Sequence, residues 1–183
     1  MIVFLASWAM MFAALFFVYG FARSKSLSWP PPGAPSLPVA LPALNTAVLL
    51  ASSATFARGL RELRRGHRSA FTAMVSVTFG LGAVFLGLQL LVFRQVAASG
   101  LSLGDGIYGA VFYAFTAFHG LHVAVGLAIL LWVLFRSRGA AHGTDRGSLP
   151  FSEHNTIAVR VCTMYWHFVD AVWVLMFFTI YVL

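Results

Sequence analysis

Four ionisable side chains of types that could do chemistry stand inside long apolar stretches of this sequence. They form two pairs with the same three-residue spacing, His119 with His122 and His167 with Asp170. On a helix, residues three apart lie on one side of the surface. An Asp at the centre of a bilayer costs about 2.5–3.5 kcal/mol on insertion scales. We therefore expect these groups to pair with one another or to take part in a reaction.

Three interpretations of these four groups stay open. In the first they form a structural polar clamp between two consecutive antiparallel spans, with Asp170 accepting a hydrogen bond from His119 or His122. In the second the histidines ligate haem or a metal, because imidazole is the commonest metal ligand. In the third the histidines and Asp170 carry protons, as ionisable groups do in membrane pumps. The predicted core adds only Gln89 as a strongly polar group, which favours a structural or supporting role.

The composition indicates a polytopic membrane protein. The chain has 183 residues, of which 60% are hydrophobic and 9% charged, whereas a soluble domain is about 25% charged. Five apolar stretches are long enough to cross a hydrocarbon core of about 30 Å, namely residues 2–22, 41–60, 71–93, 107–135 and 157–183. The first is too long for the apolar part of a typical signal peptide. We expect an all-α integral membrane protein with five transmembrane helices in a single domain, 1–183.

The basic residues predict the orientation of the chain. Net charge is +7, and the basic residues lie at predicted helix ends without the interleaved aromatic residues of a nucleic-acid surface, so no nucleic-acid partner is expected. Nine flank the second and fourth connections and three flank the first and third: Arg58, Arg61, Arg64, Arg65, Arg68, Arg136, Arg138, Arg146 and Arg160 against Arg23, Lys25 and Arg94. The positive-inside rule then places the N-terminus inside and the C-terminus outside.

The first connection and the helix surfaces carry further expectations. Residues 24–42 hold six of the seven prolines and are predicted to run extended along the membrane surface, with Trp29 at headgroup level. Asn45-Thr46 is a plausible N-cap region for the second span. Five glycines are expected where helices approach closely, namely Gly80, Gly82, Gly87, Gly120 and Gly126. Three arginines are candidate surface or lipid contacts, namely Arg61, Arg64 and Arg65.

Several motifs resemble subunit III of haem-copper terminal oxidases. In chain order they are Trp29-Pro30-Pro31, Leu44-Asn45-Thr46-Ala47-Val48-Leu49-Leu50-Ala51-Ser52, Asp105-Gly106-Ile107-Tyr108-Gly109, Phe118-His119-Gly120-Leu121-His122-Val123 and Tyr165-Trp166-His167-Phe168-Val169-Asp170-Ala171-Val172-Trp173. Their order and spacing fit that family over nearly the whole chain. The chain is similar to its short five-helix form, which also occurs in bacterial quinol oxidases.

This resemblance implies a fold, a role and a set of partners. The fold would be a V-shaped bundle of two helix groups with phospholipids in the cleft. The role would be that of a non-catalytic subunit of a bacterial haem-copper cytochrome c oxidase in the inner membrane. Such a subunit packs against catalytic subunit I, supports its proton uptake and slows its inactivation during aerobic respiratory electron transport. Haems and copper would belong to partner subunits, and phospholipid would be this chain's ligand. Other subunits would set the electron donor, the haem types and any respiratory supercomplex.

The sequence also departs from the pattern of the family. Family members usually carry three glutamates at positions that align with Trp8, near Val92 and with Arg160 here. Their loss puts in doubt any proton-antenna or lipid-tuning role that needs acidic groups. Two alternatives stay open, a subunit-III-like accessory protein of a nitric oxide reductase and a self-standing membrane cytochrome with two histidines on its haem.

Overall fold

A computed structural model describes residues 2–142 and 153–183, and the side chains of residues 6–137 and 158–183. The described chain is helical: α1 (Ile2–Lys25), α2 (Ala40–Arg64), α3 (Arg68–Ala98), α4 (Gly106–His142) and α5 (Glu153–Phe177), which continues as a π-helix, η1 (Phe178–Val182). All five helices are long and apolar enough to cross a membrane, and the described residues form no strand. The predicted all-α fold with five spans is confirmed.

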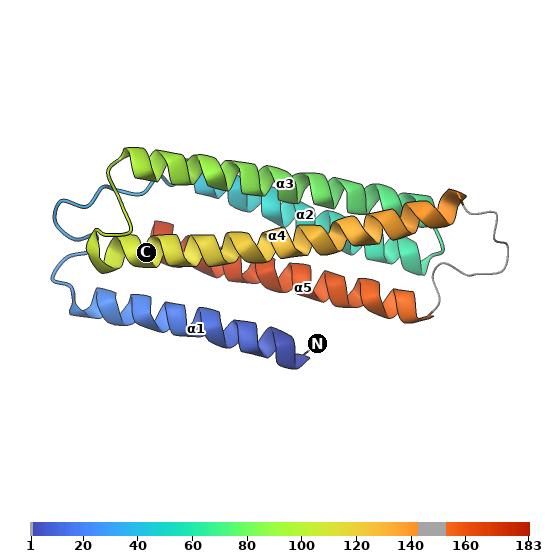
Figure 1. The fold of residues 1–183 in the computed structure, drawn as a ribbon, viewed down its shortest axis with the longest axis horizontal. Coiled ribbons are helices and arrows are strands. Elements are labelled where there is room, and N and C mark those ends of the chain that lie inside the picture. Colours follow the sequence, from blue (N-terminus) through green and yellow to red (C-terminus); the bar gives the residue numbers. More distant parts are fainter. Residues whose placement is uncertain (1, 143–152) are drawn as a thin grey trace.

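The helices lie side by side in one elongated bundle (Figure 1). Four of them form the core, because α2 packs against α3 and α5, and α4 packs against α3 and α5. Helix α1 lies at the edge of this core, against α4 and α5. The two splayed groups of helices that the resemblance implies are not seen among the described residues, where only α1 stands apart from the core.

The basic residues gather at one end of the bundle. The C-terminal end of α2 and the start of α3 meet there, with Arg58 and Arg68 at its limits, and the far end of α4 brings Arg136 to the same end. The smaller basic group belongs to the opposite end, where α1 and α3 finish. Arg146 lies outside the described residues. The side of the membrane to which each end belongs stays a prediction.

The contact between α2 and α3 has a seven-residue repeat. Buried positions of α2 follow a spacing of three and four residues, as do those of α3: Asn45, Leu49, Ser52, Phe56, Gly59 and Leu63 on α2, and Phe71, Val75, Thr78, Gly82, Phe85, Gln89, Val92 and Val96 on α3. This spacing keeps one stripe of each helix on its partner over many turns. The two helices are joined by the short turn between Arg64 and Arg68 and run antiparallel.

The second span begins where it was predicted, but the prediction of Asn45-Thr46 as its N-cap region is wrong. Helix α2 begins at Ala40, and its N-cap residue Val39 forms no side-chain capping bond. Pro42 fits near the helix start because the first N–H groups of a helix lack intrahelical partners in any case. Asn45 is fully buried inside the helix, and its amide donates to Gln89 Oε1 on α3 at 3.2 Å. Asn45, which was predicted as part of the cap, therefore forms a contact between α2 and α3.

Two of the five glycines lie where helices approach closely. A Cβ added to Gly82 or to Gly126 would lie 2.8 Å from the Trp166 ring, which therefore occupies the space that these residues leave. The prediction is wrong for the other three, around which an added Cβ would meet nothing within 4 Å: Gly80, Gly87 and Gly120. These spans are apolar on every side, so their sequence did not indicate which side faces inward.

Two tryptophans of α5 fill the centre of the bundle and bond to α2. Trp166 and Trp173 are almost fully buried. Trp166 Nε1 donates to Ser52 Oγ at 3.1 Å, and Trp173 Nε1 donates to Thr46 Oγ1 at 2.9 Å. In lipid, helix association depends on close packing and on such polar contacts, because the surrounding solvent is itself apolar. These side chains therefore fix how α5 faces α2.

Candidate functional site: the buried polar groups of α4 and α5

His119 is held by aromatic rings. Its side chain is 1% exposed. The imidazole centroid lies 5.7 Å from the Phe85 ring of α3 and 5.0 Å from the Trp173 ring of α5. Neither ring nitrogen has a hydrogen-bond partner among the described residues. His119 therefore joins α3, α4 and α5 through packing.

His122, one turn further along α4, contacts α1. Its ring meets the Trp8 ring edge to face, with centroids 3.7 Å apart, and the Phe12 ring at 5.2 Å. Its Nδ1 donates to the backbone carbonyl of Phe118 in the same helix. The Tyr165 hydroxyl of α5 donates to the His122 carbonyl at 2.9 Å. This residue therefore links α4 both to α1 and to α5.

His167 and Asp170 of α5 both lie beside Ser53 of α2. His167 is exposed and its Nδ1 forms a hydrogen bond with Ser53 Oγ. Asp170 is 4% exposed, and Ser53 lies beside its carboxylate as well. Neither carboxylate oxygen has a partner in hydrogen-bond geometry among the described residues. Asp170 is thus a buried acid that the described part of the chain leaves without a hydrogen bond.

The four predicted groups do not form one cluster. The hydrogen bond that the clamp requires between Asp170 and His119 or His122 is not formed in the described structure. Residues three apart on a helix point about 60° apart, and each helix of this bundle has several neighbours. The members of a pair therefore reach different partners. A role of these groups in stabilising the protein stays a prediction.

The described residues offer no ready metal site. Among them, no three His, Cys, Asp or Glu side chains lie close enough together to hold a metal ion. The two histidines of α4 pack against different helices, His119 against α3 and α5 and His122 against α1. The arrangement can supply ring packing and single hydrogen bonds between helices.

Sequence reasoning missed the buried polar contacts between helices, among them one between α2 and α3. Asn45 of α2 pairs with Gln89 of α3, and the buried Tyr181 hydroxyl lies beside Gln89. Three atoms of this group have no partner among the described residues: Asn45 Oδ1, Gln89 Nε2 and the Tyr181 hydroxyl oxygen. The seven-residue repeat of small and polar residues in α2 was the available signal, because it places Asn45 on the stripe that faces α3.

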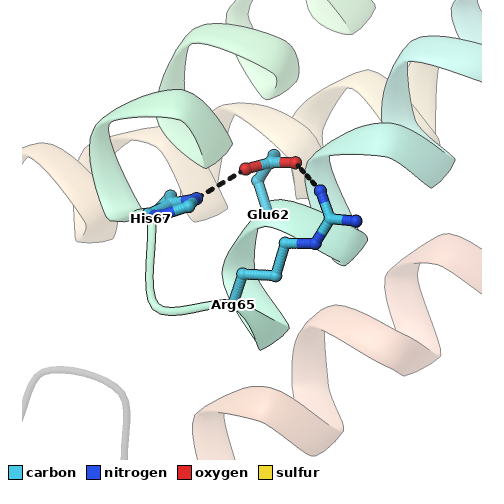
Figure 2. Close-up of polar contacts among 3 residues, drawn as sticks. All are labelled: Glu62, Arg65 and His67. Carbon is cyan, nitrogen blue, oxygen red and sulfur yellow. Dashed lines mark hydrogen bonds and ion pairs between the residues drawn. The ribbon is translucent and has the colours of Figure 1, made fainter.

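The predicted surface residues lie in two different settings. Trp29 is half-buried, with its ring edge to face with Tyr19 at 5.4 Å and with Tyr108 at 5.2 Å. Figure 2 shows the second setting, in which Glu62 accepts a hydrogen bond from Arg65 at 2.9 Å and one from His67 Nδ1 at 2.8 Å.

The other two arginines of this surface are exposed. Arg61 and Arg64 have no ion pair with a described residue. Contacts between any of these surface residues and lipid stay predictions.

The three positions that align with family carboxylates lie in different surroundings. Trp8 contacts His122, and Val92 is fully buried in a second apolar cluster with Phe112 and Tyr181. Arg160 is exposed near the basic end. Two of the three positions are therefore occupied by apolar packing.

Comparison with known proteins agrees with the resemblance seen in the motifs. The chain matches the family described as cytochrome c oxidase subunit III over residues 1–183. It is 32% identical to cytochrome c oxidase subunit 3 of Synechocystis sp. over 182 residues, which covers 100% of this chain and 73% of the relative. The corresponding protein of Thermostichus vulcanus is 32% identical over 183 residues, with 100% and 85% covered. That of Lumbricus terrestris is 37% identical over 188 residues, with 99% and 68% covered. With its five spans, this chain is a multi-pass membrane protein that belongs to the cytochrome c oxidase subunit III family.

Proposed function

We propose that this chain is the non-catalytic subunit III of a bacterial haem-copper cytochrome c oxidase. In this role it packs against catalytic subunit I in the inner membrane, stabilises it and supports its proton uptake. The observation that carries the proposal is the match to the family over the whole chain, together with relatives named as subunit 3 of cytochrome c oxidase. Haems and copper would reside in the partner subunits, and this chain would bind phospholipid.

The distribution of polar groups supports an indirect role in proton uptake. A proton path needs groups within hydrogen-bond reach of one another across the membrane. Here the polar side chains within the spans belong to separate contacts: Asn45 with Gln89, His167 with Ser53, and His119 among aromatic rings. A subunit built in this way would act on proton uptake through the packing of its neighbour.

The outer surface supports assembly within the membrane. Large apolar side chains on the outside of α1 are exposed, namely Met10 at 73%, Phe17 at 73% and Phe21 at 57%. Further exposed apolar side chains line α3 and α4, including Leu90 and Leu121. Surfaces of this kind suit lipid chains or the spans of a partner subunit. In the proposed orientation the basic end of the bundle faces the cytoplasm.

The experiment that tests this function is a gentle affinity purification of the tagged chain from its native membranes. The purified complex is examined by a reduced-minus-oxidised spectrum and by metal analysis. We expect a haem-copper catalytic subunit and stoichiometric copper. Iron without copper would identify a nitric oxide reductase as the partner, and haem on this polypeptide alone would identify a cytochrome. Either result contradicts the proposal.

The supporting role requires a second comparison, between the oxidase with and without this subunit. We expect the initial rate of electron transfer to be largely retained without it, because the redox centres lie elsewhere. Proton uptake should be slower, and the number of turnovers before inactivation should fall. An enzyme that keeps both properties without the subunit would contradict a supporting role. Loss of haem or copper signals on removal would contradict the assignment of the chain as non-catalytic.

A further inference from the structure

His167 is an ionisable side chain on the outside of the bundle at the depth of the hydrocarbon core. It is exposed, and its apolar span runs from Ala158 to Val182. At a rise of 1.5 Å per residue, His167 lies more than about 10 Å from either end of that span. Ionisable residues at such depth almost always face the interior of a bundle or a water-filled cavity. The outward position of His167 departs from that rule, whereas His119 and His122 are buried.

Only one of the two ring nitrogens of His167 is satisfied within the described part of the chain. Its Nδ1 forms a hydrogen bond with Ser53 Oγ of α2, and no other described residue forms a hydrogen bond with this imidazole. Lipid acyl chains carry no hydrogen-bonding group, so a polar atom that faces them stays unsatisfied at a cost in free energy. A polar group from another protein span would remove that cost at Nε2.

The surface around His167 suits a neighbouring helix. Ala171 lies one turn further along α5 and is exposed. On α2, Leu50 and Ala57 lie on the same side as Ser53, with Leu50 51% exposed and Ala57 half-buried. Small side chains let the backbones of two membrane helices approach closely. The α2–α5 junction, formed by these five residues, thus surrounds one polar atom with an apolar surface that a helix can reach.

The chemistry of the partner group follows from the imidazole. The Nε2 atom is a donor in one neutral tautomer and an acceptor in the other. A hydroxyl or a primary amide can act in both ways, whereas a carboxylate only accepts. A partner carboxylate would also bring a second acid close to Asp170, whose own carboxylate lies beside Ser53. Since buried charges are costly to desolvate, a neutral hydroxyl or amide fits this place best.

We propose that a transmembrane helix of a partner subunit docks on the α2–α5 junction. In this contact His167 Nε2 forms a hydrogen bond with a hydroxyl or amide side chain of that helix. The identity of the partner, a span of the catalytic subunit, rests on the proposed function. The place of the contact rests on the outward imidazole and its surroundings.

The first test is site-specific crosslinking in native membranes. The photoreactive amino acid p-benzoylphenylalanine replaces Ala171 in the tagged full chain, and crosslinked peptides are identified by mass spectrometry. We expect crosslinks to one span of the catalytic subunit, with a hydroxyl or amide residue within about one helical turn of the labelled position. The control places the same amino acid at Leu121, which is 60% exposed between α3 and α4. It should not label that span.

The outcomes separate this inference from the proposed function. Crosslinks from Ala171 to a second copy of this chain, or to no protein, in a complex that holds haem and copper would overturn the docking site and leave the proposed function intact. Equal labelling of the same span from Leu121 would also overturn it. Crosslinks to a catalytic subunit with iron and without copper would support the docking site and contradict the proposed function.

The role of His167 itself is tested by how firmly the purified complex retains this chain as detergent is increased. His167→Leu should raise the dissociation of the chain by about threefold, and at most about twentyfold, the range for one polar contact between membrane helices. His167→Gln keeps a donor and an acceptor and should restore much of the retention. Met164→Leu, on the same side of α5 and 51% exposed, is the control and should change nothing. Unchanged retention of His167→Leu would overturn the proposal.

Ser53→Ala separates the outward contact from the bond within the chain. It removes the partner of Nδ1 and leaves Nε2 for the docked helix. We expect this variant to dissociate less readily than His167→Leu. Thermal unfolding of each complex, followed by circular dichroism, shows that the variants are folded before their retention is compared. The same loss in both variants would show that the bond to Ser53 holds the chain in the complex, which contradicts an outward contact.

Discussion

The four-helix core and helix α1 are held in different ways. In the core, side chains of α2 bond to α3 and α5, as in the pairs Asn45 with Gln89 and Ser52 with Trp166. Helix α1 meets the core through aromatic rings, such as Phe16 with the Phe115 ring of α4 at 4.8 Å. Among the described side chains of α1, only Phe12, Tyr19 and Ala22 are buried.

One end of α1 carries a polar attachment as well. The Tyr19 hydroxyl donates to the carbonyl of Thr179 at 2.7 Å, and Arg23 donates to the Tyr19 hydroxyl at 3.1 Å and to the carbonyl of Leu183. The comparison of the two regions shows what defines the arrangement of the core helices. Trp166 packs into the space beside Gly82 and Gly126, and side chains form hydrogen bonds between helices. Helix α1 is held by hydrogen bonds near its C-terminal end, and much of its surface is left for lipid or a partner.

The largest expected effect comes from filling a space in the core. Gly82→Leu should lower the free energy of unfolding by about 1–3 kcal/mol, because overpacked side chains must shift their neighbours. The first added atom would already lie 2.8 Å from Trp166 and from Leu127. Denaturant titration in detergent measures this loss. Gly80→Leu on the same helix is the control, since its Cβ would meet nothing within 4 Å. Equal losses in both variants would mean that the core is not packed as described.

Asp170 offers a test of the buried polar groups. Its carboxylate has no hydrogen bond to a described residue, and an unsatisfied buried polar group costs about 1–3 kcal/mol. Asp170→Leu should therefore raise the free energy of unfolding by up to about that amount. Asp170→Asn, which keeps a polar group at the same place, should raise the free energy of unfolding by less than Asp170→Leu. If Asp170→Leu instead lowers stability, the carboxylate does bond to a neighbour, and Ser53 of α2 is the side chain that lies beside it.

The contact between Asn45 and Gln89 can be measured by a double-mutant cycle. With Asn45→Leu and Gln89→Leu, we expect a coupling free energy of about 0.6 kcal/mol, and at most about 1.7, the range for polar contacts between helices in a membrane. Unfolding in detergent supplies the four values of the cycle. A cycle that pairs Asn45→Leu with Gln95→Leu is the control, because Gln95 is exposed on the same helix. That second cycle should be additive.

The most local effect is expected at α1. Tyr19→Phe removes the bond to the Thr179 carbonyl and should cost about 0.5–1.5 kcal/mol. Because α1 lies outside the core, the loss should show as faster hydrogen exchange of α1 amides while those of α2 and α3 keep their protection. Phe17→Leu on the exposed side of α1 should leave the exchange unchanged. Faster exchange throughout the bundle would show that α1 is part of the core after all.

The sequence predicted the helices well and their inward sides poorly. Residues 71–93 were predicted as a span, and α3 covers them and continues at both ends. Five glycines were predicted as close contacts, but only Gly82 and Gly126 meet Trp166. In lipid the outside of a helix is as apolar as its inside, so the hydrophobic pattern that orients helices in soluble proteins is weak here.

For the candidate site, too, the sequence predicted the residues but not their contacts. The sequence predicted His119, His122, His167 and Asp170 as buried polar groups, because ionisable residues in a span are rare and costly. Three of them are buried, and His167 is exposed. The sequence did not predict their partners. Helix α5 turns His167 toward Ser53 of α2, and α4 turns His122 toward Trp8 of α1. Those contacts depend on the order of the helices around the core.

The sequence by itself determined the five spans and the family of this protein. Backbone groups in a bilayer must be satisfied within each segment, so a long apolar stretch has little choice but to form a helix. The motifs that identify the family are short stretches of sequence, so they too can be recognised without the tertiary structure. Only the tertiary structure decided which residues meet, such as Asn45 with Gln89 and Trp166 with Gly82 and Gly126. These contacts depend on the rotation of each helix about its axis, which is set by the packing of all its neighbours at once.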